Sequence, residues 1–220
     1  MARSTKSPKS RITPRSSSTG RGPGRPAKFN RETALETALQ TLWKRGYVGA
    51  SASALSDAMG IERSSFYNTF LGREALFREI LKLYGQITPD RPLGQITLGQ
   101  AVTPVVEKVF RDVCRVRAAD PESKGCLMVN SIVMLVGNDP ALAPEIVGAV
   151  QRQIQVFEAL LQQAARQGEI PVPKDMRAAA YTLTIFLIGL NVISKVENKE
   201  AVLWASCRHQ LSNLGFQIKK

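Results

Sequence analysis

The sequence predicts an all-α protein of about nine helices. Along most of the chain, apolar residues recur three and four positions apart, which is the spacing of a helix that buries one face. Residues that end helices separate these stretches, as in the run Gly137-Asn138-Asp139-Pro140. With 220 residues, the chain can bury a substantial core and is expected to form one or two domains.

The N-terminal arm, residues 1–29, is basic and is expected to be disordered. It holds eight of the 30 lysines and arginines and no acidic residue, in a chain whose net charge is +12. Serine, threonine, proline and glycine dominate the arm, so it has little apolar surface to bury. Two interpretations stay open for Arg21, Arg25 and Lys28. They can enter a narrow minor groove from an extended Gly/Pro backbone, or they can form a solvated tail that attracts DNA without specificity.

Three short helices follow the arm. The first is predicted at residues 31–46, with an apolar stripe along it and Gly46 at its end. Ser51 is placed to cap the second helix, and Gly60 can adopt the positive φ that a tight stop requires. In the third helix, Phe66 and Phe70 are four positions apart and are expected to bury one face.

The other face of the third helix is polar. A helix-turn-helix requires this division, because one helix braces the next, which presents polar groups to the major groove of DNA. We therefore predict a DNA-binding domain, with a connecting helix, over residues 30–84. The residues expected to contact DNA are Arg21, Arg25, Lys28, Ser51, Ser53, Arg63, Ser64, Ser65, Tyr67, Asn68 and Arg73.

The stretch SASALSDAMGIERSSFYNTFLGREALF, residues 51–77, resembles the DNA-binding motif of the TetR family of transcriptional regulators. That motif runs T-x-x-x-I-A-x-x-x-G-V-S-x-x-x-x-Y-x-x-F-x-x-K-E-x-L. The chain departs from it at Ser56 in place of alanine, at Glu62 in place of a capping serine, and at Thr69 where an aromatic residue is frequent. The resemblance implies a homodimeric repressor that binds a pseudo-palindromic operator in double-stranded DNA and is released by an effector.

Residues 85–220 are expected to form a helical domain for effector binding and dimerisation. Its helices are predicted at Leu98–Ala119, Cys126–Val136, Pro144–Gln167, Asp175–Val196 and Glu200–Leu214.

The most apolar run, Ala178–Ile193, is shorter than the roughly 20 residues that a membrane span needs. We therefore expect no membrane association, and we interpret the run as a helix buried on all sides, partly against a second subunit. The alternative is that this helix and the last one serve only the core of the monomer. The residues predicted at the dimer interface are Ile185, Gly189, Val192, Leu211 and Leu214.

The inventory of reactive residues argues against an enzyme. The single histidine, His209, stands late in a predicted helix, and no glycine-rich phosphate loop follows a strand. Three widely spaced cysteines without a second histidine cannot build a zinc site, so no metal or cofactor is expected. A low, odd number of cysteines is typical of a reducing cytoplasm, where we place the protein.

Cys126 differs from the other two cysteines because it stands at the start of a predicted helix, where the dipole favours a thiolate. Lys195, on a later helix, is placed to approach it. The segments G-C-L-x-V and G-x-N-x-x-x-K resemble those of the NemR-type branch of the family, whose members sense electrophiles or oxidants. This resemblance makes Cys126 the sensing thiol and Lys195 the group that activates it. The alternative is that Cys126 is only a small buried residue at a tight helix start.

The function predicted from the sequence is a DNA-binding transcriptional repressor released by a small molecule or by modification of Cys126. The alternative is an architectural protein that binds DNA without specificity through its basic arm. The long apolar C-terminal region argues against this alternative, because a protein that only coats phosphates needs no such region.

Overall fold

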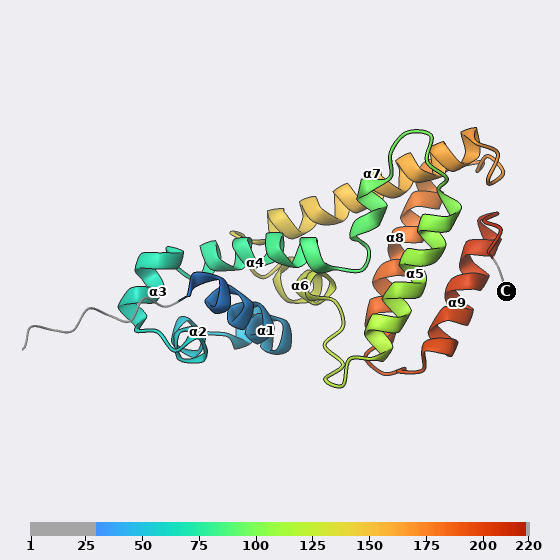
Figure 1. The fold of residues 1–220 in the computed structure, drawn as a ribbon. Coiled ribbons are helices and arrows are strands. Elements are labelled where there is room, and N and C mark those ends of the chain that lie inside the picture. The colour runs from blue at the N-terminus through green and yellow to red at the C-terminus, as the bar shows by residue number, and fades with distance from the viewer. Residues whose placement is uncertain (1–29, 219–220) are drawn as a thin grey trace, which may run out of the picture.

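The computed structural model describes residues 30–218, in which nine α-helices and one short 3-10 helix form an elongated molecule without strands (Figure 1). The all-α prediction is confirmed. The basic arm, with Arg21, Arg25 and Lys28, lies outside the described residues. The elements are α1 (Arg31–Gly49), α2 (Ala52–Met59), α3 (Arg63–Phe70), α4 (Arg73–Ile87), η1 (Arg91–Gln95), α5 (Thr103–Ala118), α6 (Leu127–Leu135), α7 (Ala143–Arg166), α8 (Met176–Ile193) and α9 (Glu200–Asn213).

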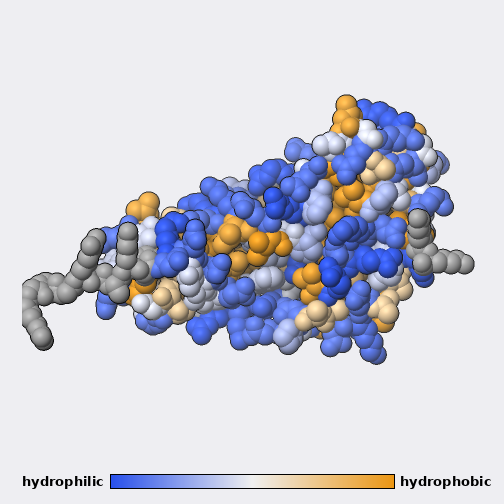
Figure 2. Space-filling view, in the orientation of Figure 1, coloured by the Kyte–Doolittle hydropathy of each residue, from blue (hydrophilic) through white to orange (hydrophobic). Residues whose placement is uncertain are grey.

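Helices α1, α2 and α3 form one end of the molecule, and α5, α8 and α9 form the other (Figure 1). Helices α4 and α6 lie between the two ends, and the long helix α7 runs from this middle region along the C-terminal end (Figure 1). Helix α7 packs most extensively against α8, and α5 packs against α9. The face in Figure 2 is largely hydrophilic, with separate apolar patches between the two ends and on the C-terminal half.

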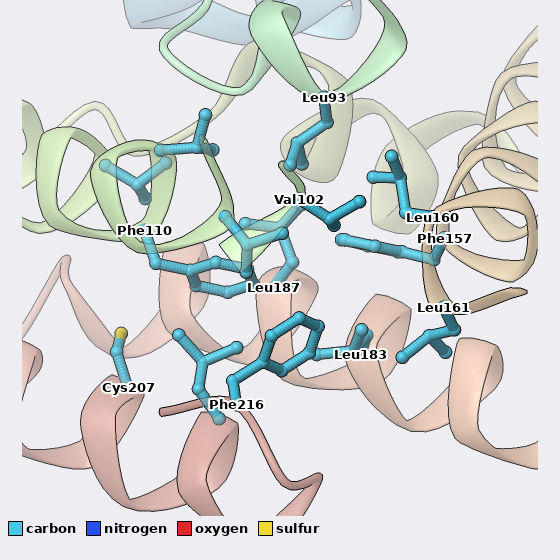
Figure 3. Close-up of a cluster of buried hydrophobic side chains, with 14 of the residues drawn as sticks. Leu93, Val102, Phe110, Phe157, Leu160, Leu161, Leu183, Leu187, Cys207 and Phe216 are labelled. Carbon is cyan, nitrogen blue, oxygen red and sulfur yellow. The ribbon is translucent and has the colours of Figure 1, made fainter. Parts of the chain in front are cut away.

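Two hydrophobic cores hold the fold together. One lies within the C-terminal half, where Phe110, Phe157 and Phe216 meet leucines of α7 and α8 (Figure 3). The other holds the helices of the N-terminal end and extends past residue 84, because Leu127 and Leu135 of α6 and Ile146 of α7 belong to it. The core of the predicted DNA-binding domain therefore includes α6 and the beginning of α7.

Helix α5 starts at Thr103, five residues later than the sequence predicts. The reason is a cap from a distant residue: the Glu169 carboxylate accepts hydrogen bonds from the backbone N–H groups of Val102 (2.8 Å) and Thr103 (2.6 Å). These N–H groups stand at a helix start and have no partner within the helix. The preceding residues form η1 and a loop, which the apolar periodicity does not reveal.

Helix α1 loses its helical geometry at Gly46 (φ 70°, ψ 168°) and then continues to Gly49. The predicted end at Gly46 is therefore a kink. A Cβ atom at this position would lie 2.5 Å from the Met134 sulfur of α6. A side chain at residue 46 would therefore strain the backbone and displace the end of the Met134 side chain.

Helix α8 is long and apolar enough, by length and composition alone, to cross a membrane. One face of it packs on α7, whereas the opposite face is exposed in the single chain. The prediction that this helix is buried on all sides is therefore not met within one protomer. Burial of its exposed apolar face requires a second molecule.

Candidate DNA interface and effector cavity

The turn between α2 and α3 has the geometry that the sequence predicts. The Ser51 hydroxyl caps α2 by accepting from the Ala54 N–H (3.1 Å). Gly60 ends α2 in the left-handed region (φ 66°, ψ 33°), and its N–H donates to the Asp57 carbonyl (3.1 Å). Glu62 precedes α3 without capping it through its side chain. The chain therefore reverses within three residues, so that α2 packs against α3.

Helix α3 buries Phe66 and Phe70 and turns a polar face outward. Ser65 is half-buried, while Arg63, Ser64, Tyr67 and Asn68 are exposed. The Tyr67 ring packs edge-on against Phe66, with 5.3 Å between ring centroids, and the Arg63 guanidinium lies 5.9 Å from the Tyr67 ring. Within residues 30–218, no hydrogen bond occupies the side chains of Ser64, Tyr67 or Asn68. These polar groups are available to a ligand.

Two arginines near these helices contact other residues of the protein and connect α1 with α4. Arg31 forms a two-pronged ion pair with Glu79 of α4 (2.7 and 2.8 Å). Arg73 stacks on the Tyr47 ring at 4.0 Å and donates to the backbone carbonyls of Tyr47 (3.2 Å) and Ala50 (3.5 Å). These contacts fasten α4 to the end of α1, a role that the sequence did not predict for Arg73. Its contact with DNA stays a prediction. Ser51 and Ser53 are exposed on α2.

A cavity of about 310 Å³ lies between α4, α6, α7 and α8. Most of its wall is apolar, including Leu81, Met128 and Ile188. The side-chain amide nitrogen of Gln153 is buried in this region and has no hydrogen-bond partner within residues 30–218. An unpaired buried donor is unfavourable unless a ligand or water supplies an acceptor. The cavity is therefore suited to a small apolar molecule that carries an acceptor oxygen or nitrogen.

Cys126 lines this cavity, as do Tyr84 and Asn191. It is the N-cap residue of α6 and is buried from bulk solvent. The sequence correctly places it at the helix start. The neighbouring Tyr84 is held in the protonated form, because burial and then the adjacent Cys126 thiol raise the pKa of its hydroxyl. Arg117 donates to that hydroxyl (3.0 Å) and to the Asn191 amide oxygen (2.7 Å).

The loop before Cys126 contacts the DNA-binding helices directly. The Trp43 indole N–H, on α1, donates to the Gly125 carbonyl (3.0 Å). The same indole packs edge-on against Tyr84 at 5.1 Å. Gly125 has φ 67°, and a Cβ atom there would lie 3.1 Å from the Asn191 carbonyl and 3.2 Å from the Lys195 side chain. Only glycine fits between these neighbours without displacing them.

Lys195 lies near Cys126, as the sequence predicts, but its ammonium is directed elsewhere. Its methylene groups cover Gly125, while the ammonium donates to the Asn130 side-chain oxygen (3.3 Å). Sequence reasoning missed Tyr84, which lies beside the thiol, and Arg117, which donates to the Tyr84 hydroxyl. A single arginine among the 30 basic residues gives no signal of burial in the sequence.

Comparison with known proteins identifies the family. The family model described as "Bacterial regulatory proteins, tetR family" matches residues 34–80. A second, described as "Tetracyclin repressor-like, C-terminal domain", matches residues 103–209. Together they cover well over half of the chain. The chain belongs to the TetR family.

Two relatives align with this TetR-family protein over most of their own length. The transcriptional repressor ComR of Escherichia coli (strain K12) is 25% identical over 173 residues, which span 78% of this chain and 82% of ComR. The uncharacterised regulator YezE of Bacillus subtilis (strain 168) is 25% identical over 174 residues, spanning 79% and 90%.

Two solved structures show the same architecture. A cysteine mutant of the TetR-family regulator CifR, in complex with a 26-bp operator duplex, has a TM-score of 0.74 and 28% identity, covering 87% of this chain and all of CifR. The regulator SCO4454 of Streptomyces coelicolor, with a TM-score of 0.68 and 17% identity, shares the fold, covering 84% of this chain and 87% of SCO4454. The TetR-family chain is thus a transcriptional regulator that binds operator DNA and is not an enzyme.

The predicted interface residues of this regulator divide into two groups. Ile185 (66% exposed), Gly189 and Val192 lie on the open face of α8, next to the exposed Val196. Leu211 is fully buried in the C-terminal core of its own protomer, and Leu214 packs half-buried against the same core. Leu211 therefore has no surface to offer a partner, because its turn of α9 faces α5. This is a correction to its predicted role.

Cys114 and Cys207 form a contact that the sequence does not suggest. Their sulfur atoms lie 3.4 Å apart in the C-terminal core, between α5 and α9. The hydrogen bond to Cys114, together with burial, raises the pKa of the Cys207 thiol. A thiol that stays protonated is a poor nucleophile, so this pair contrasts with Cys126, which lines a cavity.

Proposed function

We propose that this protein is a cytoplasmic, homodimeric repressor that leaves its operator when a small apolar effector occupies the cavity or when Cys126 is modified. The proposal rests on two features of the position of Cys126. The residue lines the cavity, and the carbonyl just before it accepts the Trp43 hydrogen bond from α1. A change at the thiol therefore reaches the DNA-binding helices through one hydrogen bond.

The DNA-reading surface of the proposed repressor is the outer face of α3. In a homodimer two such helices lie about 34 Å apart and contact successive major grooves of a pseudo-palindrome. The exposed apolar strip formed by Ile185 and Val192 of α8 and by Val196 just after it supplies the surface that a partner covers. The basic arm adds attraction to phosphate. Support also comes from the relatives, since ComR is named a transcriptional repressor and CifR is held on its operator.

Release requires that the effector or the modified thiol interact differently with the DNA-bound and free conformations. Helix α4 is the element whose position can differ between these two conformations. It contributes Leu81 and Tyr84 to the cavity wall, while its first turn is fastened through Arg73 to the end of α1. A movement of α4 by a bound molecule changes the separation of the two recognition helices.

The test uses the full-length protein and a duplex that the protein itself selects from random-sequence DNA. Binding is followed by fluorescence anisotropy while a low micromolar electrophile or hypohalous oxidant is added. We expect release from the operator, reversed by reductant when the product is reversible. Cys126→Ser should bind the operator without responding, whereas Cys114→Ala and Cys207→Ala should respond as the unchanged protein does.

Alkylation rates of the three cysteines in the folded state decide between modification and simple ligand binding. If Cys126 reacts no faster than Cys114 and Cys207, sensing by the thiol is refuted and the cavity acts through a reversibly bound ligand. The architectural alternative makes a different prediction, namely equal affinity for the selected duplex and for random DNA at every salt concentration.

A further inference from the structure

Arg117 is a buried cation without a carboxylate partner. Its side chain is 3% exposed, and none of the ion pairs within residues 30–218 includes it. A guanidinium remains charged at any physiological pH. Burial of a charge is unfavourable unless nearby groups or a ligand compensate it. Among the residues that the structure describes, its side-chain contacts are two neutral acceptors, on Tyr84 and Asn191, and the Trp43 ring at 5.8 Å. A positive charge that no ion pair balances therefore lies behind Tyr84, which lines the cavity together with the charged residues Asp90, Arg91 and Arg152.

Tyr84 connects the Arg117 guanidinium with the cavity. Its hydroxyl oxygen accepts from Arg117, so its own O–H can donate on the cavity side, where the Cys126 thiol is its neighbour. Tyr84 and Cys126 both line the cavity, so the donor and the sulfur face the same space. The raised pKa of Tyr84, caused first by burial and then by the adjacent thiol, keeps the proton on its oxygen. A hydroxyl fixed by a guanidinium next to a nucleophile is the arrangement that stabilises negative charge on an oxygen.

We infer that Tyr84, polarised by Arg117, stabilises the negative charge that develops on an oxygen of the electrophile when the Cys126 sulfur attacks it. The site then selects electrophiles in which an oxygen takes up the electron pair, such as conjugated carbonyl compounds and epoxides, over alkyl halides. The inference rests on the proposed function, because it takes Cys126 as the reactive group.

The reaction with a conjugated carbonyl compound needs no oxidant and has no leaving group. The Cys126 thiolate forms a bond to the β-carbon, and the electron pair of the carbon–carbon double bond moves toward the carbonyl, whose oxygen becomes negative. Tyr84 keeps its proton and donates a hydrogen bond to that oxygen, while Arg117 holds the Tyr84 hydroxyl in place. Solvent then supplies a proton to the α-carbon, which restores the carbonyl group. With an alkyl iodide, by contrast, a carbon–sulfur bond forms, iodide leaves and no oxygen gains charge.

The experiment compares two thiol reagents of similar size on the full-length protein. N-ethylmaleimide is a conjugated carbonyl compound, and iodoacetamide is an alkyl iodide. Peptide mass spectrometry gives the rate at which each modifies Cys126. The ratio of the two rates is then compared between the unchanged protein and Tyr84→Phe, which removes only the hydroxyl. We expect the ratio to fall by at least about ten-fold, since a positioned donor contributes roughly 100-fold or more in dry sites and water can partly replace it here.

Asn191→Asp supplies a second, nearly isosteric variant, which gives Arg117 a carboxylate and cancels its charge. We expect it to slow both reagents, because the positive charge favours the thiolate that each reagent needs. Thermal melting confirms that each variant is folded. Lys195→Ala serves as a control for general loss of positive charge near the loop, and it should leave the ratio unchanged.

The outcomes separate this inference from the proposed function. If the unchanged protein reacts at Cys126 and leaves its operator, but Tyr84→Phe keeps the same ratio, the role of Tyr84 is refuted and the proposed function stands. If Asn191→Asp slows neither reagent, the charge of Arg117 plays no part and the inference is overturned. If neither reagent modifies Cys126 in the unchanged protein, this inference and thiol sensing are refuted together, while reversible ligand binding is not.

Discussion

Replacement of Tyr67 by phenylalanine isolates the contribution of one hydroxyl to operator binding. The ring is held by its edge-on contact with Phe66 at 5.3 Å, and it is 44% exposed. Its hydroxyl makes no hydrogen bond within residues 30–218. The substitution therefore removes nothing from the fold, and we expect the free energy of unfolding to change by less than about 0.5 kcal/mol.

Operator affinity should fall, because the hydroxyl is expected to donate to a phosphate or a base edge. One such contact is worth about 1–3 kcal/mol, which corresponds to a loss of roughly five- to 150-fold in Kd. Asn68→Ala should weaken binding by a similar amount. Alanine is the better helix former, so this variant should be as stable as the unchanged protein or slightly more stable.

Fluorescence anisotropy with the selected duplex measures both variants at one fixed salt concentration. Asn198→Ala, in the exposed segment between α8 and α9, is the matched control and should bind normally. If folded Tyr67→Phe and Asn68→Ala both retain the Kd of the unchanged protein, α3 is not the recognition helix and the assignment of the DNA interface is wrong.

Three further predictions address the arm, the thiol and the dimer. Deletion of residues 1–28 should leave the melting temperature and dimerisation unchanged, but it should lower operator affinity and make its dependence on salt shallower; an unchanged salt slope would exclude the arm from DNA contact. Lys195→Ala should slow alkylation of Cys126 by either reagent, as measured by mass spectrometry, and equal rates would show that this ammonium does not influence the thiol. Ile185→Glu should convert the dimer to a monomer in sedimentation experiments without unfolding it, because the side chain is exposed in one protomer; Leu211→Ala should instead destabilise the protomer by about 2–5 kcal/mol, and a normal melting temperature for this variant would contradict its place in the core.

Local patterns in the sequence predicted most of the helices and the polar outer face of α3. Residues such as Gly60, Phe66 and Phe70 act through neighbours within a few positions, so their roles follow from spacing. The start of α5 did not follow, because its cap comes from Glu169, which is more than 60 residues away. Long-range contacts of this kind leave no periodic signal.

The same distinction explains what the sequence did not reveal at the candidate sites. Arg73 follows the motif in sequence, yet its neighbour in space is the Tyr47 ring, a contact that the spacing of the motif does not reveal. Leu211 fits an apolar stripe on α9, but a stripe does not reveal whether it faces the protomer core or a partner. Arg117 looks like any other surface cation in the sequence, and only the packing of α4, α5 and α8 shows that it is buried.

Helix α7 takes part in both hydrophobic cores, since Ile146 near its start belongs to the N-terminal one and Phe157 in its second half to the C-terminal one. A chimaera that exchanges DNA-binding specificity by a cut after α4 would therefore expose the faces of α1 and α4 that contact α6. A graft that keeps its core intact must carry α6 and the first turns of α7 with the reading helices. In this fold the unit that recognises DNA and the unit that can be transplanted have different boundaries.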